Sequence, residues 1–443
     1  MATTDTKSLL PRVMSLVVAP FVALVAFALF HQKGIGMVAD GRALWEGAVN
    51  LFEGNGYRYF SGNPVIAWPP LYSFYLVPWI KFLGASGWSL LLSNGLLIVL
   101  QTFFWNAFFQ RMARQSGILL SALQSFIMSL FLGLFIAIIL RSVLSYNLLY
   151  VFLPLYLGVL WHCFRAKDSS IRPWDILWVG VLGTAMMLTH NASLAFVAAG
   201  SAVMAVTQAM VKRSLLWVIL TQGSTLAVTL CAPLLIWHNV RDLFHQTGSH
   251  YVGLGAGKYT PLEYAYQLLW GPGRLLVFDK MMFNTIRTGV VATVLLLLAI
   301  FYLMHRDRRA PALRFATLFV SVSSAVLCLM FNVTWIYSGI AASTYIMFIP
   351  LILGPTAYIT AISLKMRLAT VFAFAFLVPQ LYWAGRWTAG QYTSTLADLD
   401  FPRSFASPEA YISPMYRSGP PVITTKGILI PSSTEEEPRG RRM

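Results

Sequence analysis

Apolar residues recur in long runs along this 443-residue chain, and charged residues gather between the runs. Within the runs the apolar positions show no alternation of period two, which argues against a transmembrane β-barrel. Several runs reach the length of roughly 20 residues that a helix needs to cross a bilayer core of about 30 Å. The pattern therefore predicts an all-α polytopic membrane protein with about eleven spans, at residues 13–31, 86–109, 118–140, 145–163, 174–189, 193–211, 215–237, 288–304, 313–331, 341–362 and 368–385.

Composition supports this prediction. The chain is 57% hydrophobic and only 11% charged, with a mean hydropathy of +0.67, whereas soluble domains carry roughly 25% charged residues. The net charge of +16 could indicate a nucleic-acid partner. However, with the N-terminus inside, the short inner segments hold 15 of the 32 basic residues, and the short outer turns hold only Arg141. This asymmetry follows the positive-inside rule, so we expect membrane lipid around the chain and no nucleic acid.

Longer segments interrupt the spans on the predicted outer side. They are residues 32–85, residues 238–287 and the tail 386–443, so residues 1–385 are expected to form one transmembrane domain. Long outer segments in compact proteins are usually functional. The tail is rich in proline and carries a Glu435–Glu437 run, and we expect it to be partly disordered.

The first outer segment carries the clearest local pattern. Apolar residues between 42 and 52 share one helical face, which predicts an amphipathic interfacial helix with Asp40 at its N-cap. Gly54-Asn55-Gly56 is typical of a left-handed turn that ends a helix. Residues 70–83 form a second interfacial stretch, too short and too proline-rich to be a confident span. Counting it as a span would also move the basic clusters outside.

These motifs closely resemble the opening of the GT-C-type glycosyltransferases that use polyprenyl-phosphate-linked sugars. The resemblance rests on Asp40, Gly54-Asn55-Gly56-Tyr57 and Pro69-Pro70-Leu71-Tyr72, and further on residues 180–190, 233–239 and, more weakly, 343–350. It covers about the first 350 residues in order. The chain departs from the family at three places: the outer turn 141–147 has no carboxylate, His190 replaces Arg or Lys, and Thr344 replaces Arg.

The resemblance implies a GT-C-like bundle, with interfacial helices in its first outer loop. It also implies that a sugar passes with inversion from a lipid phosphate to an acceptor hydroxyl at the outer face. That chemistry needs a base for the acceptor proton and cations for the leaving phosphate. Asp40 lies just beyond the first span, at the level of a lipid phosphate, so we expect it to be the base; the alternative is a plain helix N-cap. Arg141, Lys258 and Arg274 are the candidate phosphate-binding residues, and solvated or snorkelling charges are the alternatives.

The candidate substrate-binding residues are Glu46, Tyr57, Trp68, Pro70, Tyr72 and His190. Each has a simpler interpretation as well. Glu46 and Glu53 suit the solvated face of the interfacial helix, Trp68 and Tyr72 suit an aromatic belt, and His190 suits a structural histidine. No spacing of His, Cys and carboxylates predicts a metal site, and no glycine-rich loop predicts a nucleotide. We therefore expect no cofactor.

The predicted partners are a polyprenyl-phosphate sugar and an envelope lipid or glycan acceptor. The predicted location is the plasma membrane of a bacterium, with the active site on the extracytoplasmic side. A non-enzymatic lipid or solute transporter is one alternative, although a transporter normally shows polar groups or broken helices at mid-span. An envelope-polysaccharide polymerase is another, but it lacks this order of opening motifs.

Overall fold

The computed structural model is helical. It describes residues 6–30, 36–37, 39–60, 62, 65, 68–139, 142–143, 145–165, 173–190, 192–210, isolated positions between 216 and 229, 311–334 and 338–363. The helices are α1 (Thr6–Phe30), α2 (Ala39–Phe52), α3 (Leu71–Leu83), α4 (Gly87–Gln115), α5 (Ala122–Ile139), α6 (Tyr146–Arg165), α7 (Pro173–Thr189), α8 (Ser193–Met210), α14 (Pro311–Thr334) and α15 (Ser338–Ser363). Two short strands, β1 (Gly36–Met37) and β2 (Ser142–Val143), pair in parallel.

The described residues hold ten helices, not the eleven spans that the sequence predicts. Eight of them fall on predicted spans, and the other two, α2 and α3, fall in the first outer segment as expected. The 13 residues of α3 are too few to cross a bilayer core. The predicted spans 288–304 and 368–385 lie outside the described residues, as does nearly all of 215–237.

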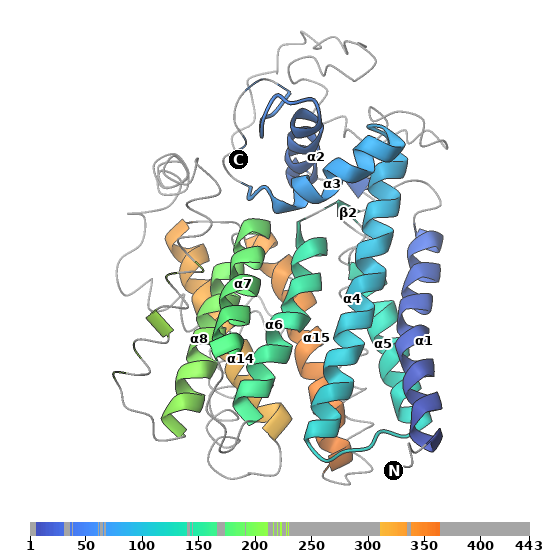
Figure 1. The fold of residues 1–443 in the computed structure, drawn as a ribbon, viewed down its shortest axis with the longest axis vertical. Helices are drawn as coiled ribbons and strands as arrows, with labels where there is room; N and C mark the ends of the chain where they lie inside the picture. The colour runs from blue at the N-terminus through green and yellow to red at the C-terminus, as the bar shows by residue number, and fades with distance from the viewer. Residues whose placement is uncertain are drawn as a thin grey trace, which may run out of the picture.

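The long helices run side by side, and α2, α3 and β2 lie together at one end of the bundle (Figure 1). We call this the upper end; the N-terminus lies at the lower end. Connectivity brings the end of α1, the start of α4, the end of α5, the start of α6 and the end of α7 to the upper end. Helix α1 packs on α4 and α5, α6 packs on α4, α7 and α8, and α14 packs on α8 and α15.

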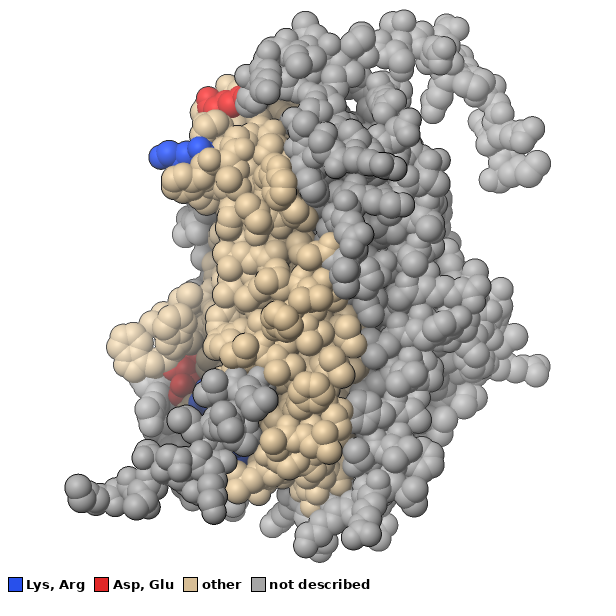
Figure 2. Space-filling view, turned by 90° about the vertical axis from the view of Figure 1, so that its right-hand side faces the viewer, with Lys and Arg blue, Asp and Glu red and all other residues tan. Residues whose placement is uncertain are grey.

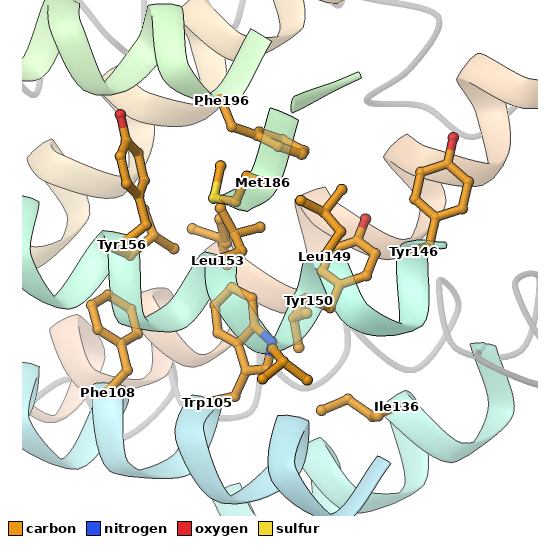
Figure 3. Close-up of a cluster of buried hydrophobic side chains, with 14 of the residues drawn as sticks. Trp105, Phe108, Ile136, Tyr146, Leu149, Tyr150, Leu153, Tyr156, Met186 and Phe196 are labelled. Carbon is orange, nitrogen blue, oxygen red and sulfur yellow. The ribbon is translucent and has the colours of Figure 1, made fainter. Parts of the chain in front are cut away.

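Large side chains fill the space between α4, α6, α7 and α8 (Figure 3). The Trp105 ring of α4 stacks on Phe109 at a centroid distance of 5.8 Å, and Tyr156 of α6 is fully buried against Gly200 of α8. In a bilayer, close packing of this kind must hold helices together, because lipid tails are as apolar as the side chains.

The α1–α5 contact depends on a glycine. A Cβ added to Gly133 of α5 would lie 2.7 Å from the backbone oxygen of Ala19 in α1. We expect Gly133→Ala to push the two helices apart and to lower the free energy of unfolding by about 1–3 kcal/mol. Thermal unfolding of the purified protein in detergent measures this change.

Gly158 of α6 provides the matched control, since a Cβ there meets nothing within 4 Å. Gly158→Ala should leave stability unchanged or raise it by up to about 1 kcal/mol through helix propensity. Equal melting temperatures for the two variants would contradict the close α1–α5 contact.

The bundle is apolar outside and partly polar inside. Helix α4 exposes Leu92, Leu96 and Phe103 and buries Asn94 and Gln101 completely. On the described part of the face shown in Figure 2, charged residues lie towards the two ends and the middle is uncharged. A water-soluble protein would place these groups the other way round, whereas lipid-facing helices are apolar outside.

By length and hydropathy alone, α4 and α6 could each cross a membrane; in the other apolar helices, the part that could be assessed among the described residues is 10–17 residues long.

Candidate functional site

The parallel pair β1 and β2 joins the segment after α1 to the segment after α5. Gly36 pairs with Ser142, and Met37 pairs with Val143. The pair lies at the upper end, beside the start of α2. Two segments about a hundred residues apart in sequence, each carrying a predicted site residue, therefore meet there.

Asp40 lies within the first turn of α2. The helix begins at Ala39, so Asp40 is its second residue. Asp40 therefore lies inside the first turn and not at the predicted N-cap. A carboxylate in the first turn still interacts favourably with the positive end of the helix dipole. The backbone of Asp40 is thus fixed at the upper end, three residues after β1; its side chain lies outside what the structure describes.

The sequence predicted that α2 lies open at a membrane interface. In the structure, protein covers the helix instead. Every residue from Ala43 to Asn50 is buried. Glu46 is only 3% exposed, and its Oε2 accepts the backbone N–H of Phe60 at 2.9 Å. The side-chain amide of Asn50 donates to the carbonyl of Arg58 at 2.8 Å. The solvated face predicted for Glu46 is therefore wrong, because the chain after α2 folds back over it; Glu53 is exposed as predicted.

The turn after α2 has the predicted conformation. Gly54 and Gly56 have φ angles of 82° and 81°, in the left-handed region that glycine adopts without strain. The chain then brings Tyr57 against Gly47, where any side chain would overlap the Tyr57 ring. The Tyr57 hydroxyl donates to the carbonyl of Trp68 at 3.0 Å, and burial raises the Tyr57 pKa above its usual value. Tyr57 thereby links α2 to Trp68.

Glu46 should be important for the order of this segment. We expect Glu46→Ala to remove the acceptor for Phe60 and to weaken the local structure by about 1.5–3 kcal/mol, the usual value for a hydrogen bond to a charged group. Hydrogen exchange of residues 57–60 should then accelerate.

Glu53→Ala, which removes an exposed carboxylate seven residues further on, should leave that exchange unchanged. If both variants exchange alike, Glu46 does not hold the segment.

Three aromatic rings meet beneath this segment, and we call Trp68, Tyr146 and His190 the imidazole cluster. His190 follows α7 directly and is 4% exposed. Its ring stacks on Tyr146, the first residue of α6, at a centroid distance of 4.1 Å, and lies 5.8 Å from the Trp68 ring. The cluster therefore joins the first outer segment, α6 and α7.

His190 is neutral and its tautomer is fixed. Burial lowers its pKa to about 3. Its Nδ1 accepts the backbone N–H of Ala192 at 3.0 Å, so the ring proton resides on Nε2. Nε2 makes no hydrogen bond to any described residue. His190 therefore presents a neutral N–H donor at the upper end of the bundle.

Pro70 and Tyr72 point toward the framework of the bundle. Pro70 is buried at the start of α3, and its carbonyl accepts the backbone N–H of Phe74 at 2.9 Å. The Tyr72 hydroxyl donates to Asn94 Oδ1 of α4 at 3.0 Å. Asn147 of α6 donates to the same oxygen. Tyr72 thus anchors α3 to α4 and α6.

Sequence reasoning missed Tyr146, Asn94, Asn147 and Gln101. Gln101 donates to the carbonyl of Asn147, which extends the polar network about two further turns along α4. A signal was available, since amides at 94 and 101 are seven residues apart and so share one face of an otherwise apolar span. The candidate phosphate-binding residues Arg141, Lys258 and Arg274 all lie outside the described residues.

No protein-family model matches the chain, and no curated protein matches it. Among solved structures, the crystal structure of ArnT from Cupriavidus metallidurans in the apo state is similar over 88% of this chain and 79% of that chain. The TM-score is 0.41 and the sequence identity is 15%.

Proposed function

We propose that this chain is an integral membrane glycosyltransferase that moves a sugar from a polyprenyl phosphate to an envelope lipid or glycan at the outer membrane face. One observation carries the proposal. The backbone of Asp40 and the imidazole cluster belong to the same end of the bundle, and a continuous set of contacts through Gly47, Tyr57 and Trp68 connects them. The order of motifs in the sequence supports it independently.

The distribution of charge supports an extracytoplasmic location for this end. Among the described side chains, the lower end carries four basic residues and one acidic residue: Arg111, Arg114, Arg165, Arg314 and Asp175. The upper end carries two of each: Arg58, Lys81, Glu46 and Glu53. Basic residues are enriched on the cytoplasmic side of membrane proteins. We infer that the lower end is cytoplasmic.

In the proposed reaction, the Asp40 carboxylate takes the proton of the acceptor hydroxyl. The acceptor oxygen then forms a bond to the anomeric carbon from the face opposite the phosphate. The bond between that carbon and the phosphate oxygen breaks, and the electron pair leaves on the phosphate, so the configuration inverts. Because His190 is neutral, cations for the leaving phosphate must come from other residues; we assign this role to Arg141, Lys258 and Arg274. The proposal includes no cofactor.

Transport of a lipid or solute is the second candidate. The buried amides Asn94 and Gln101 favour it, since polar groups inside membrane spans often mark a substrate path. Those amides nevertheless hydrogen-bond to Tyr72, to Asn147 and to the backbone, which also suits a structural role.

The decisive experiment incubates the purified protein with radiolabelled polyprenyl-phosphate sugars and envelope lipids, and separates the products by chromatography. We expect one labelled sugar to move to an acceptor; a ladder of repeating units would instead indicate a polymerase. Sealed proteoliposomes loaded with the same lipids test transport in parallel. If label crosses the bilayer without any covalent transfer, the glycosyltransferase proposal is wrong.

A further inference from the structure

The imidazole cluster has a hydrogen-bond donor that no described residue uses. His190 is only 4% exposed, yet its Nε2 makes no hydrogen bond to any described residue and is not among the completely enclosed polar atoms that lack a partner. The Nε2–H is therefore open to an acceptor on another molecule.

The orientation and the tautomer of the His190 ring are both fixed by its neighbours. The ring stacks on Tyr146 with an interplanar angle of 29°, and the Trp68 ring lies beside it at an interplanar angle of 44°. The bond from Ala192 to Nδ1 fixes both the ring orientation and the tautomer. The N–H of Nε2 is therefore preorganised, and it carries no net charge.

A neutral donor bordered by aromatic rings suits an uncharged oxygen better than a phosphate. Phosphate in proteins is bound by Arg or Lys, whose charge offsets its own. A pyranose ring instead offers neutral hydroxyls on its edge and apolar C–H groups on its face, and the partly exposed Trp68 provides an aromatic surface for such apolar groups.

We propose that the imidazole cluster binds the sugar, with the Nε2–H of His190 donating to a ring hydroxyl, and that it does not bind the phosphate. This assignment rests on the proposed glycosyl transfer, because it names the part of the substrate that this site takes. The sugar of the donor and that of a glycan acceptor share this chemistry, and the kinetics distinguish them.

Three variants of the full chain test the assignment. His190→Phe retains a ring against Tyr146 but has no N–H; it should lower kcat/KM by about 10- to 100-fold, the effect of losing one buried hydrogen bond. His190→Gln has an amide N–H near the position of Nε2 and should recover most of the activity. His190→Asn has its amide near the position of Nδ1 and should not. A raised KM for the prenyl-phosphate sugar assigns the hydroxyl to the donor, and a raised KM for the glycan assigns it to the acceptor.

A binding measurement separates this inference from the proposed function. Saturation-transfer NMR on the protein in detergent should show that at least one of the methyl glycosides of glucose, mannose and galactose binds the wild type and not His190→Phe. Binding of inorganic phosphate, followed by the line width of its phosphorus NMR signal, should be the same for both proteins. If no donor is ever turned over but glycoside binding depends on His190, the reaction is wrong and the sugar site remains.

Other results would overturn the sugar site itself. These are transfer at wild-type rates by His190→Phe, glycoside binding that is absent or independent of residue 190, or phosphate binding that disappears with His190. Should His190→Phe melt early, the comparison of the Gln and Asn variants decides, and greater activity of the Asn variant contradicts the inference.

Discussion

Replacing Asp40 by Asn is expected to abolish nearly all sugar transfer while leaving the fold intact. Asn keeps the size of the side chain and can still accept a hydrogen bond in the first turn of α2, but it cannot take the acceptor proton. Loss of a positioned general base typically lowers the rate by about 100- to 10,000-fold. The rate of label transfer from the prenyl-phosphate sugar measures this loss in kcat, and KM should change little.

Glu53→Gln is the matched control, since it removes an exposed carboxylate from the same outer segment. Its activity should equal that of the wild type, and thermal unfolding of both variants should occur near the wild-type temperature. If Asp40→Asn folds normally and turns over at a wild-type rate, Asp40 is not the base, and its role is limited to the helix terminus.

Replacing Asn94 by Ala is expected to cause the largest loss of stability. Asn94 Oδ1 accepts hydrogen bonds from the Tyr72 hydroxyl and from the Asn147 amide, and all three side chains are buried. The alanine variant leaves both donors without that acceptor, which should cost about 2–4 kcal/mol in total. Because Tyr72 belongs to α3 and Asn147 to α6, the loss should also disturb the neighbouring Trp68 and Tyr146.

Thermal unfolding in detergent tests this expectation against Ser93→Ala. Ser93 is equally buried and adjacent, but its hydroxyl donates only to the carbonyl of Leu90 within its own helix. We expect Ser93→Ala to melt within a few degrees of the wild type and Asn94→Ala to melt well below it. The amide network has no such anchoring role if the two variants melt together.

Much of the fold follows from local sequence. Eight described helices overlap predicted spans, because long apolar runs bounded by charges favour helices, and two of them, α4 and α6, are long and apolar enough to cross a membrane. The turn at Gly54 and Gly56 was predictable for a similar reason, since a positive φ angle favours glycine whatever the surroundings.

The site itself was less predictable. Glu46 was expected in solvent because a carboxylate on a helix usually lies there, but the chain from Tyr57 to Phe60 folds back and buries it. Tyr146 carried no local sign of a role, since its partner His190 is more than forty residues away in sequence.

The sequence by itself determined which segments are helices, which ends carry the basic charge, and where the outer segment turns, because hydrophobic length, charge and backbone conformation are properties of neighbouring residues. Only the tertiary structure decided that α2 is buried, that Asn94 joins three helices, and that His190 lies neutral between Tyr146 and Trp68. Those features depend on contacts between distant segments, and the free energy of burying a polar group is set by the partner that the fold brings to it.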